Sequence, residues 1–200
     1  MGIYPETKHP TYFDSIGLSL EEPLVATLKA NGWDKPSSPV FIQSFEVSNL
    51  QELNGRIRVP LVQLTGASGR PYDFTAKGDV RTYADITSAA GLRELARYAD
   101  GVGPDKNQIV PRDAQNRLTR PTSLIADAHR TGLLVHPYTF RPENSFLPED
   151  FREGDPASAE YLRARGDQPA ELALFYRLGV DGVFADNADT AVAVRRRVFR

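Results

Sequence analysis

The sequence predicts an α/β protein built around a parallel β-sheet, and three observations indicate this fold. Short apolar runs alternate with helical patterns from one end of the 200-residue chain to the other. Most of these runs are continuously apolar rather than alternating, as is typical of strands buried on both faces. The segments between them carry helix-start and helix-stop signals. This alternation leaves two architectures open, a doubly wound sheet and a (β/α)8 barrel.

Six strands are expected, and the helices in the first part of the chain have recognisable ends. The strands are predicted at residues 3–5, 40–45, 60–64, 101–103, 133–137 and 182–185. Ser19 and Glu22 form a capping-box pattern before a helix that should end at residues 31–32, an Asn-Gly pair that tolerates the left-handed conformation. A second box, Ser48 with Gln51, predicts a short helix that closes at residues 54–55.

Further helices are expected in the rest of the chain. Thr87 is placed to cap a helix through residue 96, and Thr122 to cap a helix that ends before Gly132. Asp155 and Pro156 mark the start of another helix, because proline favours the first helical position. That pattern breaks near residue 166, resumes at residue 169 and stops at residue 179. A last amphipathic stretch covers residues 190–199.

Two loop-like stretches follow predicted strands, at residues 66–83 and 141–154. The first is rich in glycine and polar residues, and the second in proline and acidic residues. Binding loops of α/β proteins concentrate at the carboxyl ends of the strands. We therefore expect a binding site at this edge of the sheet.

Composition excludes several classes of protein. The 24 Lys and Arg residues nearly balance 26 Asp and Glu residues, which argues against a nucleic-acid partner. The chain has no cysteine, so disulfides, thiolate nucleophiles and Cys-ligated zinc are excluded. No apolar run reaches the roughly 18 residues that a membrane span needs. The first residues lack the basic and apolar regions of a signal peptide.

Polar side chains at the predicted strand ends are the candidates for chemistry. Glu6 and Lys8 are two residues apart and face the same way on a strand, where they could bind a metal and an anion together. The alternative is an ion pair at the end of a strand. Gln43 and Gln63 lie inside apolar strands and must be hydrogen-bonded if buried. They either bond to neighbouring strand ends or line a polar pocket.

The segment LLVHPYTFR at residues 133–141 brings three more candidates to one strand end. His136 could serve as an acid or base, or be a hydrogen-bonded packing residue. Tyr138 could stack on a substrate, and Arg141 could hold a phosphate or carboxylate through two hydrogen bonds. Spacing alone thus predicts a polar strand-end site for an anionic ligand and names no reaction.

Six segments in this order resemble the glycerophosphodiester phosphodiesterases, specifically the longer periplasmic type. The segments are GIYPETKHP, VFIQSFE, PLVQLTG, YADGVGPDK, LLVHPYTFR and LGVDGVFADNAD. The resemblance implies a TIM barrel and the hydrolysis of glycerophosphodiesters to glycerol 3-phosphate and an alcohol, in lipid and glycerol metabolism. It also implies a divalent cation, Ca²⁺ in the periplasmic type or Mg²⁺ in others, held by three carboxylates, with two histidines as general acid and base. A periplasmic or secreted location is implied as well.

The resemblance assigns roles to only some residues of this chain. Glu6 matches the third metal carboxylate, and Lys8 matches a lysine near the phosphate. Tyr138 and Phe184 lie near the expected substrate pocket, beside the spacing candidates Arg141, Gln43 and Gln63. No residue matches either catalytic histidine or the Glu-x-Asp metal pair of the family.

The resemblance therefore predicts that residues 1–200 form the C-terminal part of a phosphodiesterase domain, with about the last six barrel strands. Alone, this chain is expected to lack activity. Unpaired strand edges would favour self-association. One alternative is a barrel fragment that binds glycerophosphodiesters without hydrolysing them. Another is a different TIM-barrel enzyme that uses His136 as its base.

Overall fold

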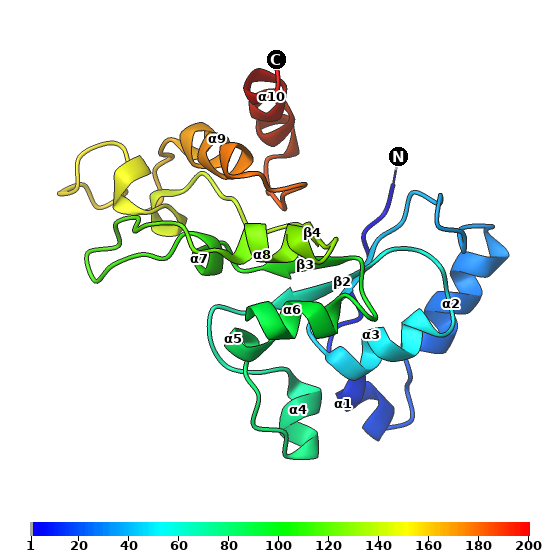
Figure 1. Ribbon diagram of the computed structural model, residues 1–200. Coiled ribbons are helices and arrows are strands. Elements are labelled where there is room, and N and C mark those ends of the chain that lie inside the picture. The colour runs from blue at the N-terminus through cyan, green and yellow to red at the C-terminus, as the bar shows by residue number, and fades with distance from the viewer. Residues whose placement is uncertain (1) are drawn as a thin grey trace. The chain divides into compact units, whose positions relative to one another are not determined.

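The computed structural model describes residues 2–200, which form two compact units (Figure 1). Unit 1 contains the chain up to Gly103 together with Ala126–Leu134. Unit 2 contains Pro104–Ile125 and Val135–Arg200. The prediction of one domain over residues 1–200 stays a prediction, and Met1 lies outside the described residues.

Four strands form one sheet in the order β1-β2-β3-β4. They are β1 (Ile42–Ser44), β2 (Leu61–Thr65), β3 (Gly101–Pro104) and β4 (Leu134–Val135). β1 and β2 pair in parallel, with Gln43 opposite Val62. Every residue of β1, β2 and β3 is buried. The predicted α/β fold, with parallel strands covered on both faces, is therefore confirmed.

The first and last predicted strands form isolated bridges instead of strands. Ile3 bridges Val40 and Glu6 bridges Gln43, both in parallel, while Phe140 bridges Ala185. The fifth predicted strand, residues 133–137, shortens to the two residues of β4. Pro137 has no N–H to donate to a ladder, which accounts for part of this shortening.

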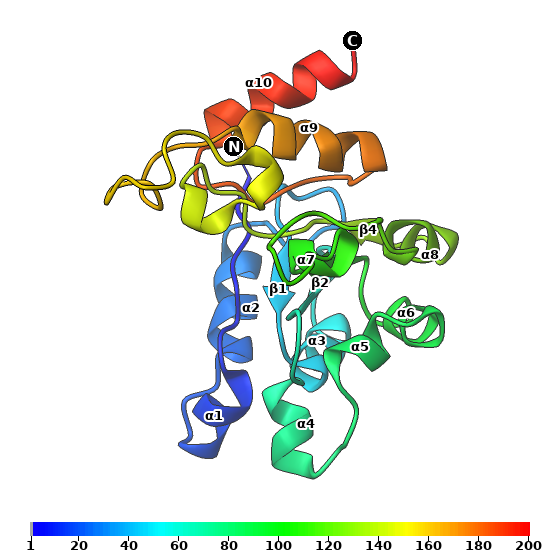
Figure 2. The ribbon, with the colours of Figure 1, turned by 90° about the vertical axis from the view of Figure 1, so that its left-hand side faces the viewer.

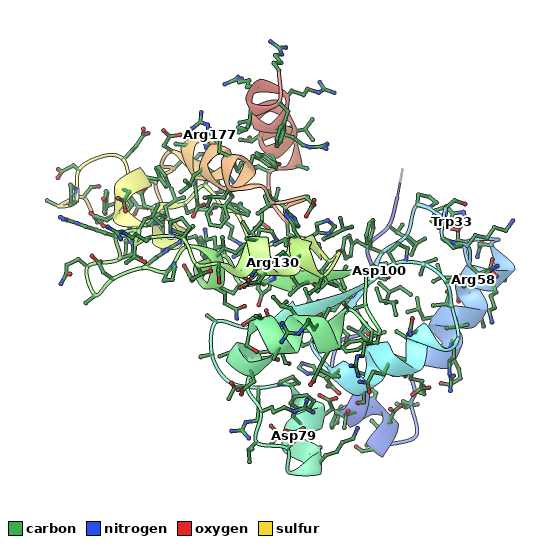
Figure 3. The ribbon with its side chains drawn as sticks, viewed as in Figure 1. Trp33, Arg58, Asp79, Asp100, Arg130 and Arg177 are labelled. Atoms are coloured by element: carbon green, nitrogen blue, oxygen red, sulfur yellow. The ribbon has the colours of Figure 1, made fainter. Side chains whose placement is uncertain are left out.

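Short helices surround the strands of unit 1. They are α1 (Pro10–Ser15), α2 (Glu21–Ala30), α3 (Val47–Asn54), α4 (Tyr72–Lys77), α5 (Tyr83–Ile86) and α6 (Ala89–Leu95). Figure 2 shows α1 and α4 at the same end of this unit, where they contact each other. α3 packs against β1 and β2 through Leu50 and Leu53, both fully buried. Asp100 accepts a hydrogen bond from the Leu61 N–H (2.8 Å) and so ties the start of β2 to the residue before β3 (Figure 3).

Unit 2 contains α7 (Lys106–Ile109), two 3₁₀ turns, η1 (Asn144–Phe146) and η2 (Glu149–Phe151), α9 (Gln168–Leu178) and α10 (Ala188–Val198). α8 (Leu124–Arg130), most of which belongs to unit 1, begins after Thr122, whose hydroxyl accepts from the Leu124 N–H at 3.4 Å. α9 and α10 pack side by side (Figure 1). Phe140 and Phe175 meet edge to face in the core, with ring centroids 5.0 Å apart. No described helix has the length and apolar character needed to cross a bilayer.

Several predicted helix starts were wrong. The residue preceding α2 is Leu20 rather than Ser19, and Glu46 rather than Ser48 precedes α3. Ser88, not Thr87, caps α6 by accepting from the Gly91 N–H at 3.1 Å. Where two Ser or Thr residues are adjacent near a helix start, the sequence does not show which of them caps the helix, because either hydroxyl can reach the same amides.

The helix predicted after Asp155 does not form, and residues 156–164 make turns and bends. Asp155 accepts from the Ala157 N–H at 2.9 Å, and Ser158 accepts from the Glu160 N–H at 3.3 Å. Such local side-chain bonds satisfy backbone donors outside a helix and compete with helix formation.

Gly91 in α6 has no space for a side chain. A Cβ there would lie 2.1 Å from the Asp85 carbonyl oxygen and 2.4 Å from that of Ile86. We predict that Gly91→Ala lowers the free energy of unfolding by about 1–3 kcal/mol or more, because backbone must shift. Gly55→Ala is the matched control, since its Cβ would make only an ordinary contact at 3.5 Å. Urea unfolding of both variants tests this, and equal stability would contradict it.

Candidate functional site

Glu6 and Lys8 lie at the end of an extended segment that Thr7 anchors to the protein. The Thr7 N–H donates to the Gln43 carbonyl at 3.0 Å, and the Gln43 N–H donates to the Pro5 carbonyl at 3.0 Å. The Thr7 hydroxyl is buried and donates to Asn49 Oδ1 of α3 at 2.6 Å. Because side chains alternate along extended backbone, Glu6 and Lys8 face away from this anchor, and both are exposed.

A cavity of about 270 Å³ in unit 1 brings Glu6 and Lys8 together. Its lining also includes Thr7, His9, Phe45, Glu46, Arg70, Tyr72 and Tyr83. Within the described chain, neither Glu6 nor Lys8 forms an ion pair with the other or with any further residue. The interpretation of these two residues as a strand-end ion pair was therefore wrong. A carboxylate and an ammonium remain available to a ligand.

Glu46 is a cavity residue that the sequence analysis missed as a candidate. Its Oε2 accepts from the Thr11 N–H at 3.1 Å, which connects the end of β1 to the start of α1. Its Oε1 is buried and has no hydrogen-bond partner among residues 2–200. Burial raises the pKa of the Glu46 carboxyl, helped by the negative charge of Asp73. The sequence feature that could have identified Glu46 is its position directly after a predicted strand. The same argument selected Glu6.

Tyr83 and His9 are two further polar lining residues that sequence reasoning did not assign. Burial and the nearby Asp73 and Glu46 carboxylates raise the pKa of Tyr83 to about 12, so its hydroxyl stays protonated. His9 precedes α1 in the left-handed conformation, with φ 58°. These residues give the cavity a neutral hydroxyl and an imidazole beside the charged pair.

The residues of unit 1 do not fit the divalent cation that the resemblance implies. That cation needs three carboxylates, and residues 2–200 contain no group of three or more His, Asp or Glu side chains able to hold a metal. Glu6 is the single residue that matches. We therefore derive no catalytic step through a metal.

The two strand glutamines have different environments. The Gln63 Nε2 donates to the carbonyls of Phe45 and Leu64, each at 3.0 Å, and its Oε1 accepts from the Tyr98 hydroxyl at 3.2 Å. Gln63 is fully buried, so its amide connects strand ends and leaves no surface for a substrate. Of the two alternatives for Gln63, bonding to strand ends is the one observed. Gln43 lies beside Glu6 through the parallel bridge, and its contact with substrate stays a prediction.

Unit 2 has its own cavity, of about 330 Å³, which contains Tyr138 and Arg141. The other lining residues are Asp105, Lys106, Asn107, Arg112, Thr139, Ser145 and Phe146. Tyr138 is fixed by its backbone, since its N–H donates to the Pro104 carbonyl (3.1 Å) and its carbonyl accepts from the Lys106 N–H (3.0 Å). Phe184 lies next to this segment, because the Phe140 N–H donates to its carbonyl at 2.8 Å, but it does not line the cavity.

A fully buried carboxylate, Glu171 of α9, lies behind this cavity. Lys106 Nζ is 2.7 Å from Glu171 Oε1, and an Arg112 terminal nitrogen is 3.6 Å from the same oxygen. Burial lowers the pKa of Lys106 and raises that of Glu171, while their mutual attraction opposes both shifts. Two cations therefore share one fully buried carboxylate.

His136 is half-buried in unit 2 and does not line either cavity described above. A Cβ added to Gly182 would lie 3.0 Å from its Cδ2 atom, so a larger residue at position 182 would require the ring to shift by a few tenths of an ångström. Burial lowers the pKa of His136, and Asp181 partly opposes the shift. These contacts support the packing interpretation of His136 over a role as catalytic base.

Comparison with known proteins identifies relatives over most of the chain. Residues 2–190 match the Glycerophosphoryl diester phosphodiesterase family. A glycerophosphodiester phosphodiesterase of Arabidopsis thaliana is 34% identical over 198 residues, which cover 93% of this chain and 49% of the relative. One from Haemophilus influenzae is 27% identical, covering 96% of this chain and 52% of the relative. The chain thus spans about half the length of these relatives.

Solved structures support the fold. A glycerophosphoryl diester phosphodiesterase structure from Agrobacterium tumefaciens superposes with a TM-score of 0.55 at 15% identity, covering 98% of this chain and 58% of that one. A glycerophosphodiester phosphodiesterase from Parabacteroides distasonis gives 0.55 at 13% identity, with the same coverage. Together with the parallel four-stranded sheet, these matches support the predicted incomplete barrel.

We predict that Glu171→Leu costs about 3–5 kcal/mol of stability, because it leaves Lys106 buried without its counter-charge. The double variant Lys106→Met with Glu171→Leu should cost less than the sum of the two single variants. Urea unfolding of all four proteins measures this coupling. Additive costs would contradict the buried pair.

We also predict an acid sensitivity that comes from His136. Because burial lowers its pKa, the unfolded chain binds a proton at this site more readily than the folded chain. The contribution to stability is therefore complete above the ordinary histidine pKa of about 6.5 and is lost as the pH falls toward the lowered value. The His136→Gln variant should lose less stability than the wild type between about pH 7.5 and pH 5. Parallel pH profiles of unfolding would rule this out.

Proposed function

Because this chain belongs to the glycerophosphoryl diester phosphodiesterase family, we propose that it acts in the hydrolysis of glycerophosphodiesters to glycerol 3-phosphate and an alcohol. One observation carries the proposal. Glu6 and Lys8, the two residues that the resemblance assigns to the metal and the phosphate, line one cavity and take no protein partner among residues 2–200. The products would enter glycerol and lipid metabolism.

Lys8 is the residue proposed to contact the phosphodiester. Its ammonium supplies a positive charge to the phosphoryl oxygens, and a charge-assisted hydrogen bond of this kind is stronger than a neutral one. The exposed position of Lys8 allows a ligand to reach it, and Thr7 fixes the backbone on one side. Glu6, on the same face, is the proposed contribution to a cation site.

The cation itself stays a prediction, with Ca²⁺ favoured and Mg²⁺ as the alternative. Both are hard cations that take several oxygen ligands, and one carboxylate does not make such a site. We therefore expect residues 1–200 by themselves to bind Ca²⁺ weakly. Titration calorimetry with Ca²⁺ alone checks this expectation, and a submicromolar Kd would contradict it.

We further propose that this chain alone binds glycerophosphodiesters without turning them over. Of the three histidines, His9 lines the cavity of unit 1, whereas His136 is half-buried in unit 2 and His129 is exposed on α8. None of them matches a catalytic histidine of the family. A binding fragment, the second candidate function, is favoured by the same absence of a group of metal ligands among residues 2–200.

A coupled glycerol 3-phosphate assay with glycerophosphocholine and Ca²⁺ tests the catalytic part. The purified chain should show no turnover above the background rate. Turnover that disappears in His9→Ala would instead identify His9 as a general acid or base and overturn the proposed inactivity. Turnover lost only in His136→Ala would favour the alternative barrel enzyme.

Calorimetry with glycerophosphocholine tests the binding part. We predict that Lys8→Gln weakens binding by about tenfold or more, since a hydrogen bond to a charged group contributes about 1.5–3 kcal/mol. Lys35→Gln removes an exposed lysine outside the cavity and serves as the matched control. Unchanged affinity in Lys8→Gln would refute the assigned phosphate contact.

The location in the periplasm or outside the cell, implied by the resemblance to the periplasmic type, stays a prediction. Self-association through strand edges likewise stays a prediction. Size-exclusion chromatography checks the latter, and a sharp monomer peak would count against it.

A further inference from the structure

The cavity of unit 2 is lined by more cationic than acidic side chains. Three of its lining residues are cations, Lys106, Arg112 and Arg141, whereas Asp105 is the single carboxylate. Asp105 uses an oxygen to accept from the Asn107 N–H at 2.8 Å, which caps α7. The walls therefore present more positive than negative charge.

Arg141 is held in place but keeps its terminal nitrogens unpaired. Its guanidinium lies over the Phe146 ring, 4.6 Å from the centroid. Its Nε is 2.8 Å from Asp186 Oδ2, in an orientation that makes an ion pair without a hydrogen bond. Among residues 2–200, no atom accepts a hydrogen bond from its two terminal nitrogens. These are the nitrogens through which an arginine can bind an oxyanion with two parallel hydrogen bonds.

The surrounding side chains add further unpartnered groups. The hydroxyls of Thr139 and Ser145 line the cavity, and no described residue bonds to them. Arg112 Nε and Asn107 Oδ1 are buried, and neither has a hydrogen-bond partner in the part of the chain that the structure describes. Buried polar atoms are rarely left unpaired in a folded protein, so several in one wall call for an explanation.

The cations of this wall are fixed in place by the protein. Glu171 holds Lys106, and Lys106 Nζ and an Arg112 terminal nitrogen also donate to the Phe146 carbonyl, at 3.2 and 2.9 Å. A site whose charges are already positioned loses little entropy when it binds an anion. The Asp186 carboxylate beside Arg141 is half exposed, so solvent screens it more than the buried cations.

We propose that this cavity is a binding site for a small oxyanion, specifically a phosphate monoester, held by the terminal nitrogens of Arg141 with Ser145 and Thr139. A volume of about 330 Å³ suits a phosphate with a short polyol attached. The choice of glycerol 3-phosphate as that monoester rests on the proposed function, whereas the oxyanion site itself does not. The site would then bind glycerol 3-phosphate, a product of the proposed reaction.

Calorimetry with three probes tests the site: inorganic phosphate, glycerol 3-phosphate and uncharged glycerol. Both anions should bind and glycerol should not. Arg141→Gln should weaken anion binding by about tenfold or more, because a hydrogen bond to a charged group contributes about 1.5–3 kcal/mol. Arg177→Gln is the matched control, since Arg177 is exposed on α9, away from the cavity lining (Figure 3).

Ser145→Ala provides a second variant that changes only an exposed hydroxyl, and it should weaken binding by a smaller factor. Amide chemical shifts at residues 139–146 should move when phosphate is added.

No binding of either anion, an equal loss in Arg177→Gln, or shifts confined to the Glu6–Lys8 cavity would each overturn the proposal. Binding of inorganic phosphate alone would retain the oxyanion site and reject glycerol 3-phosphate as its ligand. If the chain does not bind glycerophosphocholine, the proposed function is refuted, whereas the proposed oxyanion site is unaffected.

Discussion

The buried Glu171 carboxylate is the interaction on which unit 2 depends. It receives Lys106 from the helix after β3 and Arg112 from the following loop, and both cations also donate to the Phe146 carbonyl of η1. The segment from Lys106 to Arg112 is thereby joined to two others that are distant in the sequence, η1 through the Phe146 carbonyl and α9 through Glu171. Desolvating these charges is costly, so the cluster is stable only when every member is present. The same contacts place Phe146, on whose ring Arg141 rests.

Unit 1 positions its charged pair by a comparable arrangement of buried polar groups. Thr7 bonds to Asn49, and the Asn49 side-chain amide in turn donates to the buried Glu21 carboxylate. Glu46 ties the first turn of α1 to the end of β1. The protein uses its buried polar residues to fix short connections, and Glu6 and Lys8 remain open to solvent. In each unit, buried partners hold the backbone. Among residues 2–200, the side chains of Glu6 and Lys8 and the terminal nitrogens of Arg141 take no partner, although Arg141 Nε is ion-paired with Asp186.

Much of the fold and part of the site followed from local pattern. Continuous apolar runs identified β1, β2 and β3, and the strand-end argument found Glu6, Lys8, Tyr138 and Arg141. The pattern failed where two local solutions have similar energy. Ser88 and Thr87 can both cap a helix, and the turn bonds of Asp155 compete with a helix start. Gln43 and Gln63 look equivalent in sequence, yet only Gln63 meets the Tyr98 hydroxyl, a partner 35 residues away.

By itself, the sequence determined the parallel α/β fold, the family and the residue types at the strand ends, because these depend on periodicity and on motifs within a few residues. Only the tertiary structure decided which of those residues are free. Among residues 2–200, the absence of an ion pair at Glu6 and Lys8, the full bonding of Gln63 and the packing of His136 against Gly182 depend on neighbours distant in the chain. So does the burial of Glu171, whose position in α9 reads locally as an ordinary helical glutamate. Burial and pairing are properties of the folded chain, since side chains from separate segments must meet before either is defined.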